Sequence, residues 1–395
     1  MSSAGTRPEK LTPPSGTGTS AAGAAPEAPP AAGTTAGPKP RGTGRLTGGG
    51  PAPHAGDPDD PLGLFGTRVG GRLAVVRYMG ESSVSHIYRV VHTLMDRPAF
   101  LKVTPRDAGA ADGVPEPLKR DAQAASRIAH PCALRVLEAG ATGELAWLAQ
   151  EWSDGPNLRA IMARGRDVPV PDLLGLGLRL LEALCHLHRA GVVHGPLNPE
   201  RILFPSTSAG VGLKLFDLSR ARWVGEAPSA SPGGAGARRH GTAMVLRSSR
   251  YMSPEELREL PADPRSDLYS FGVLFAELLS GEYPYATRGT GPGAYVASHL
   301  RDEPRPLVFE PEDGVPADLP AIVRRLLAKR PEDRFDTAEA ARRALEDVVV
   351  PDLLRLNTPA DRHVLEAWRN RVRVGLRSTL VRPAEEDPEP PIGLT

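Results

Sequence analysis

His194-Gly-Pro-Leu-Asn-Pro-Glu-Arg201 and Phe216-Asp-Leu218 are two polar loop sequences that each follow a segment with a clear structural pattern. Residues 171–190 predict a long helix, because leucines recur at helical spacing, a proline begins the segment and a glycine follows it. Residues 202–204 and 213–216 are short β-prone runs. Asp217 therefore stands at a strand end, where a carboxylate suits a hard cation. A single aspartate at such a place is more commonly a turn residue.

The rest of the chain predicts strands first and helices afterwards. Expected strands occupy residues 73–78, 86–91, 98–103, 134–138 and 145–151. Expected helices occupy residues 117–130, 265–280, 319–329 and 337–348, and a loop rich in glycine, serine and arginine occupies residues 224–247. This order predicts an α+β chain with two lobes.

In this order the motifs resemble those of the eukaryotic-type protein kinase family, which includes bacterial Ser/Thr protein kinases. The resemblance covers about residues 68–348. It implies a small β-rich N-lobe at about 68–151, which includes a helix C. A larger helical C-lobe would follow at about 152–348. Besides the two loops above, it rests on His130-Pro131, Tyr251-Met-Ser-Pro-Glu255, Ser266-Asp-Leu-Tyr-Ser-Phe-Gly272, Leu278-Leu-Ser-Gly-Glu-Tyr-Pro284 and Lys329-Arg-Pro-Glu-Asp-Arg-Phe335.

The phosphate-binding part of the resemblance is incomplete. Gly80 matches the first glycine of the family's glycine-rich loop, while Ser82 and Ser85 stand at the second and third. A Cβ atom restricts close approach of the backbone to phosphates. Lys102 matches the phosphate-binding lysine, and Asp121 stands where the helix C glutamate belongs. Aspartate is one methylene shorter, so a pair with Lys102 requires the helix to lie further in.

The catalytic loop departs most from the family pattern. The alignment puts Pro196 at the position of the base that accepts the substrate's proton. Gly195 replaces the arginine before it, Asn198 the lysine after it, and Arg201 the metal-binding asparagine. Proline has no proton-accepting group, and a guanidinium cannot ligate Mg²⁺. The loop therefore retains no catalytic residue of the family, and Asp217 remains as the single metal ligand.

Three functional hypotheses follow. The first is a pseudokinase, a regulatory or scaffolding binding module with weak or no phosphotransfer from ATP. The second is an active Ser/Thr protein kinase with a non-standard loop, for which Glu200 is the nearest substitute base. The third is a small-molecule phosphotransferase, against which the protein-kinase-like segment at residues 253–255 and Arg334 both stand.

The resemblance also implies where a nucleotide would lie. Lys102 and Asp217 are retained for the phosphates, and the hinge-like Gln150-Glu151-Trp152-Ser153 would lie beside adenine. Polar Gln150 at the gatekeeper position disfavours a deep back pocket. Arg201 either neutralises phosphate charge or pairs with Asp217 and fills the site. We expect ATP to bind weakly if it binds, and the residues present give little support for a bound Mg²⁺.

Other matched residues have structural roles in the family. The resemblance implies that Asp267 accepts hydrogen bonds from the catalytic-loop backbone. Glu255 and Arg334 are expected to form a partly buried ion pair within the C-lobe. His194 is expected in the hydrophobic column between the lobes, together with Leu218, and not as an acid or base.

Composition bounds the partners and the compartment. Lysine and arginine number 48 and aspartate and glutamate 47, which argues against nucleic acid or an anionic membrane as the main partner. Two cysteines exclude a disulfide framework and a cysteine-rich metal site. No apolar run is long enough for a membrane span, and the N-terminus lacks a secretory h-region. We expect a cytoplasmic protein with a protein partner, from a high-GC bacterium.

The flanks differ from the kinase-like region. Residues 1–60 contain 12 glycines and 11 prolines and few large apolar side chains, which predicts a disordered tail. Residues 349–382 predict a helical extension, whose amphipathic stretch at 361–376 either packs on the C-lobe or binds a partner. Residues 383–395 are expected to be disordered.

Overall fold

The computed structural model describes residues 60–354, with gaps at residues 83, 164–167, 169, 206–212, 228–248, 288, 290–291 and 310–314. The expected tail before Asp60 and the C-terminal segments after residue 354 lie outside the described residues, as does most of the expected loop at 224–247. Among the residues it describes, no helix is long and apolar enough to cross a membrane.

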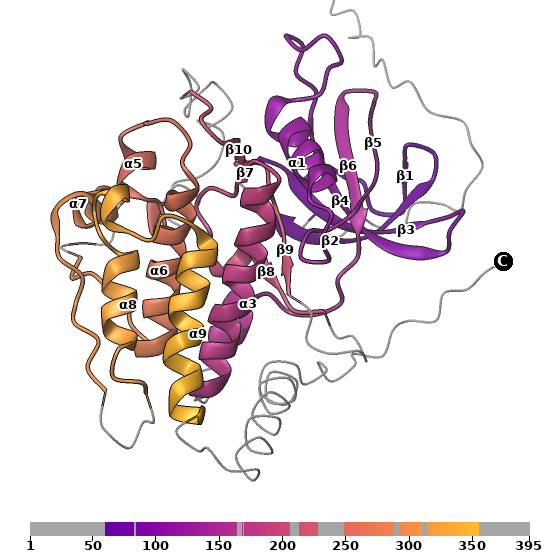
Figure 1. Ribbon diagram of the computed structural model, residues 1–395. Helices are drawn as coiled ribbons and strands as arrows, with labels where there is room; N and C mark the ends of the chain where they lie inside the picture. The colour runs from indigo at the N-terminus through magenta and orange to yellow at the C-terminus, as the bar shows by residue number, and fades with distance from the viewer. Residues whose placement is uncertain are drawn as a thin grey trace, which may run out of the picture. The chain divides into compact units, whose positions relative to one another are not determined.

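An antiparallel six-stranded sheet forms the N-lobe, in the order β1-β2-β3-β4-β6-β5 (Figure 1). Its central strands, β4 and β6, each bury five consecutive side chains, so both faces of the sheet are covered there. Helix α1 (Glu116–Arg127) contacts β5 and β6. The strands are β1 (Arg68–Val69), β2 (Leu73–Glu81), β3 (His86–His92), β4 (Arg97–Pro105), β5 (Val136–Thr142) and β6 (Leu145–Glu151).

The fifth strand begins two residues later than its predicted range and extends to Thr142. The reason lies in the residues just before it. Leu215 N donates to Cys132 O, and Ala133 forms an isolated bridge with Leu215. The chain therefore pairs with a C-lobe strand first and joins the sheet afterwards.

Helices dominate the C-lobe, where α3, α6, α8 and α9 pack side by side (Figure 1). Helix α6 is buried along most of its length, and Gly281 ends it with a left-handed φ of 73°. The helices are α2 (Leu158–Met162), α3 (Val170–Arg189), α5 (Pro254–Leu257), α6 (Pro264–Ser280), α7 (Pro292–Arg301), α8 (Leu319–Leu326) and α9 (Ala338–Leu354). Short 3₁₀ turns are η1 (Pro199–Arg201) and η4 (Pro331–Asp333), and short strands are β7 (Val192–Val193), β8 (Ile202–Leu203), β9 (Lys214–Leu215) and β10 (Arg222–Trp223).

The α+β two-lobed fold expected from the sequence is confirmed. Helix α7 was not predicted, because its inward face is partly polar. His299 is fully buried on this helix, with its Nδ1 2.9 Å from the Tyr269 hydroxyl and its Nε2 2.9 Å from the Tyr283 hydroxyl. A buried polar residue of this kind leaves no apolar periodicity in the sequence.

Candidate functional site

Three ionisable side chains meet between the lobes. Lys102 on β4 is fully buried, and its Nζ contacts Asp121 on α1 and lies 3.1 Å from Asp217 Oδ1. The shorter aspartate at the helix C position therefore reaches the lysine. Asp121 Oδ1 also accepts a hydrogen bond from Leu218 N at 3.3 Å, which ties α1 to the loop that carries Asp217.

Arg201 contacts the same carboxylate from the other side. Its Nη2 lies 3.2 Å from Asp217 Oδ2, and both side chains are buried. Of the two roles left open by the sequence, the structure shows the pair with Asp217. Burial raises the pKa of Asp217, but the charges of Lys102 and Arg201 outweigh this effect and hold the pKa well below its usual range. Asp217 is therefore an ionised carboxylate between two cations.

Arg201 and Asp217 stand at the two positions that hold the metal ion in the family. Mg²⁺ requires oxygen ligands in near-octahedral geometry. Arg201 supplies no side-chain oxygen, and Asp217 is already paired with two cations. Asn198 Oδ1 accepts from Glu200 N at 3.0 Å, so it caps η1.

The turn between β2 and β3 closes on itself. Ser82 Oγ and Ser85 Oγ are 2.9 Å apart, and Ser82 N donates to Ser85 O at 2.8 Å. Ser85 N and Val84 N both donate to Ser82 Oγ, at 3.2 and 3.3 Å. A phosphate-binding loop needs free backbone N–H groups. Here the N–H groups of Ser82, Val84 and Ser85 are satisfied within the turn, although Gly80 keeps a positive φ of 124°.

A cleft of about 1200 Å³ lies beside these groups. Ser153 lies buried in its wall, whereas Glu151 is engaged elsewhere, because its Oε2 accepts from Arg135 Nε at 2.8 Å and its Oε1 contacts Lys214. Among the residues that line the cleft are Gly80, Ser82, Ile87, Phe100, Trp152, Ser153, Asn198, Glu200, Arg201, Leu203, Phe216 and Asp217.

Aromatic side chains form the inner wall of this cleft. The Phe100 ring lies 4.5 Å from the Trp152 ring and 5.2 Å from the Phe216 ring, measured between centroids. Lys102 Nζ lies 4.2 Å from the centroid of Phe216. The sequence reasoning missed Phe100 and Phe216, although each stands within two residues of a charged group that was identified.

Asp267 organises the catalytic-loop backbone in the way expected. Its carboxylate accepts from His194 N at 2.8 Å and from Gly195 N at 3.0 Å. Gly195 has a φ of 86°, and a Cβ there would lie 3.0 Å from Arg220 O, so the loop needs glycine at this position. His194 is fully buried, and burial followed by the charge of Arg201 lowers its pKa to about 4.

The expected pair between Glu255 and Arg334 is present and fully formed. Arg334 Nη1 and Nη2 donate to the two carboxylate oxygens of Glu255, at 2.6 and 2.8 Å. Its other donors reach backbone oxygens of Arg265 and Ala328, both at 2.8 Å. Both side chains are buried.

An unpredicted clamp connects α1 to the segment after β10. Arg120 Nη1 lies 2.8 and 2.7 Å from the two carboxylate oxygens of Glu226, and it also donates to Ala221 O. Glu226 in turn accepts from Trp223 N at 2.8 Å. Arg120 also pairs with Glu116 at i,i+4 spacing, which is the sole sequence signal for this arginine's role.

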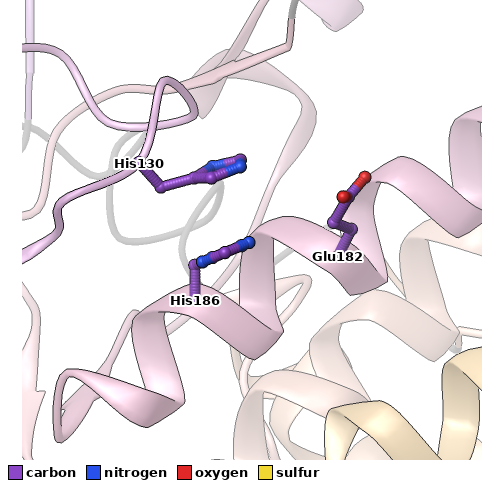
Figure 2. A group of neighbouring side chains, drawn as sticks. All are labelled: His130, Glu182 and His186. Atoms are coloured by element: carbon purple, nitrogen blue, oxygen red, sulfur yellow. The ribbon is translucent and has the colours of Figure 1, made fainter.

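His130, Glu182 and His186 form a second polar group (Figure 2), and none of the three lines the cleft. Their ligand atoms lie within 4.8 Å of one another. The two imidazole rings are stacked, with centroids 3.6 Å apart and planes 13° from parallel. Metal-binding lone pairs lie in the ring plane, so parallel rings direct them side by side, and His130 Nδ1 already accepts from Cys132 N at 3.2 Å. The geometry fits a packing contact between α3 and the turn after α1 better than a metal site.

Comparisons with known proteins agree with a protein kinase fold. A family model for the protein kinase domain matches residues 73–345. The chain is 30% identical over 284 residues to the probable serine/threonine-protein kinase SCO3848 of Streptomyces coelicolor, over 71% of this chain and 40% of the relative. It is 31% identical over 275 residues to the serine/threonine-protein kinase pkn2 of Myxococcus xanthus, over 68% of this chain and 32% of the relative. The match thus spans less than half the length of either relative.

A solved structure gives the same picture of the fold. The kinase domain of PknI from Mycobacterium tuberculosis is 25% identical, with a TM-score of 0.51. The match covers 70% of this chain and 95% of that domain.

Proposed function

This chain belongs to the protein kinase family, and we propose that it is a pseudokinase, a kinase fold that acts as a regulatory or scaffolding module with weak or no phosphotransfer. The family in general binds ATP and Mg²⁺ and transfers the γ-phosphoryl group to a protein hydroxyl. Three requirements of that reaction are a proton acceptor, a metal site and a phosphate cradle.

The contact between Arg201 and Asp217 carries the proposal. In the family the retained aspartate and the loop asparagine hold Mg²⁺. Here a tethered guanidinium lies 3.2 Å from the aspartate, where it satisfies the carboxylate without any metal. Lys102 Nζ lies 3.1 Å from the other carboxylate oxygen of Asp217. A metal ion would have to displace a buried ion pair and then find a second ligand, which Arg201 cannot supply.

Two further observations support the same proposal. Pro196 is buried at the base position and has no group that accepts a proton. The N–H groups of Ser82 and Ser85 are satisfied within their own turn. ATP binding is therefore proposed to be weak and little helped by Mg²⁺.

The intact pair between Lys102 and Asp121 favours a second candidate, an active Ser/Thr protein kinase. In the family this lysine must be held by an acidic residue of helix C before transfer can occur. Because phosphoryl transfer depends mostly on positioning and electrostatics, loss of the base alone need not abolish it. Glu200 lines the cleft and is the nearest carboxylate in sequence to the base position.

A protein is the proposed partner, because a module without catalysis acts through what it binds. The near balance of charge, 48 basic against 47 acidic residues, supports neither nucleic acid nor an anionic membrane as that partner.

Radiolabel transfer from ATP tests the proposal directly. The full-length protein is incubated with [γ-³²P]ATP and Mg²⁺, alone and with a generic acceptor protein, beside the Lys102→Met variant. The pseudokinase predicts equal background incorporation for both proteins. Incorporation that depends on Lys102 would establish the second candidate.

A further inference from the structure

We propose that Phe100 and Phe216 occupy the position of a nucleotide base, so that the protein's own side chains close this part of the cleft to purine nucleotides. This inference deepens the proposed function and rests on it. It makes the two phenylalanines the residues that determine which ligands the cleft admits.

The two rings bridge the hinge-like segment and the charged site. Phe100 lies beside Trp152 of that segment, with ring centroids 4.5 Å apart. On its other side Phe100 contacts Phe216, at 5.2 Å. Phe216 lies under Lys102 Nζ at 4.2 Å. The aromatic contacts are thus continuous from the hinge-like segment to the lysine that would hold phosphate.

Strand register fixes the direction of the Phe100 side chain. Side chains two residues apart on a strand point to the same face of the sheet. Phe100 and Lys102 are two apart on β4, and Lys102 reaches into the charged site. Phe100 pairs with Gln150 across the ladder, so its ring lies where β6 leads into the hinge-like segment.

The cluster around these rings is closely packed. Phe100 is 7% exposed and Phe216 8% exposed, although both belong to the wall of an open cleft. They bury one another together with Ile87, Leu134 and Leu203. A planar base stacked at this place would need the volume that the two phenyl rings now fill.

Two polar atoms nearby indicate what an opened pocket would recognise. Within the described part of the chain, Gln150 Oε1 and Ser153 Oγ are buried atoms without a hydrogen-bond partner. A buried oxygen without a partner is costly, and an amino group on a bound base would satisfy it. A pocket freed of a phenyl ring would therefore favour a purine with an exocyclic amino group.

Gain of binding tests the inference without any phosphotransfer. Isothermal titration measures ADP and adenosine, in the absence of Mg²⁺, against the full-length protein and its Phe100→Ala, Phe216→Ala and doubly substituted variants. The unmodified protein is expected to bind both ligands with a Kd weaker than about 1 mM, and the double variant at least about tenfold more tightly. Leu134→Ala is the matched control, because Leu134 belongs to the same cluster but is not part of the cleft wall.

Circular dichroism establishes that each variant is folded, and Phe100→Val replaces Phe100→Ala if the latter is not. ADP binding by the unmodified protein with a Kd below about 100 μM would overturn the inference. Equal affinities of the double variant and Leu134→Ala would also overturn it. Tight ADP binding would also contradict the proposed weak binding of nucleotide. The proposed lack of phosphotransfer is tested separately, since it fails only if Lys102-dependent labelling is observed.

Discussion

Arg201 is the residue whose single contact changes the chemistry of the site. A buried carboxylate needs compensation, which can come from a metal ion or from a positive side chain. For Asp217, two positive side chains compensate the charge. Lys102 Nζ lies 3.1 Å from its Oδ1, and Arg201 Nη2 lies 3.2 Å from its Oδ2. The two cations thereby stabilise the ionised form of the buried aspartate.

Arg334→Ala is predicted to destabilise the protein strongly. The substitution leaves Glu255 buried without its bidentate partner, which costs about 3–5 kcal/mol. Thermal denaturation should show a melting temperature lower by several degrees, or the variant should be insoluble. The matched control is Arg330→Ala, whose side chain is 72% exposed and pairs with Glu332 at the surface. It should change stability by less than about 0.5 kcal/mol, and equal melting of the two variants would contradict the buried pair.

His194 is predicted to make stability depend on pH. Burial and then the charge of Arg201 lower its pKa from 6.5 to about 4 in the folded state. Between these two pKa values, His194 is protonated in the unfolded chain but neutral in the folded state. The free energy of unfolding therefore falls as the pH falls from 6.5 to about 4. Above pH 6.5 both states are neutral and the effect is absent.

Urea denaturation of the unmodified protein and His194→Phe at pH 7 and pH 5 measures this contribution. From pH 7 to pH 5 the unmodified protein should lose about 2 kcal/mol more than the variant. The difference between the two proteins isolates His194 from other titrating groups, such as Glu256, whose pKa burial raises to about 7. Parallel losses would mean that His194 is protonated in the folded state.

Among the elements, α1 is held by contacts at two of its residues. Asp121 pairs with Lys102, and Arg120 pairs with Glu226 of the segment after β10. In active kinases the position of this helix is controlled by phosphorylation of the activation loop. Here Gly195 replaces the arginine that receives such a phosphate in many kinases, and the clamp holds α1 by unmodified side chains.

Glu226→Gln is therefore predicted to loosen α1. Loss of the charge removes the partly buried ion pair with Arg120 and should speed amide hydrogen exchange over residues 116–127. Glu116→Gln is the control, since Glu116 pairs with the same arginine but is 63% exposed. Its exchange should match that of the unmodified protein. No change in either variant would show that the clamp does not hold the helix.

The elements with clear periodicity were predictable, whereas those held by polar contacts were not. The leucines of α3 and the β-prone residues of β4 predicted both elements from the sequence. Helix α7 was missed, because its buried His299 contacts polar partners from other segments, which include Tyr269 and Tyr283. The start of β5 was displaced, since Cys132 and Ala133 pair with a strand more than eighty residues away in the chain.

The candidate site was predictable as a set of positions but not as a set of contacts. Motif spacing identified Lys102, Asp217 and Arg201, yet it left open whether Arg201 faces phosphate or Asp217. That choice depends on the direction of one side chain on η1, which no local pattern encodes. Phe100 was overlooked because an aromatic residue on a strand is ordinary, and its contact with Phe216 joins the two lobes.

For the whole molecule, the fold is retained while the reactive positions differ from the family. Asp267 and the pair of Glu255 with Arg334 keep the C-lobe assembled. Pro196, Arg201 and the closed turn at Ser82 lie where catalysis would need a base, a metal ligand and a phosphate cradle. We propose that the protein's own side chains fill this site, where ATP and Mg²⁺ bind in the family.

Thermal denaturation of the unmodified protein with millimolar ATP, with and without Mg²⁺, tests this claim most directly. Mg²⁺ alone serves as the control for effects of the metal on the free protein. A ligand present at 100 times its Kd adds about 2.7 kcal/mol to the free energy of unfolding. We predict that the melting temperature with ATP is the same whether or not Mg²⁺ is present. A rise of several degrees that requires both ATP and Mg²⁺ would contradict the account.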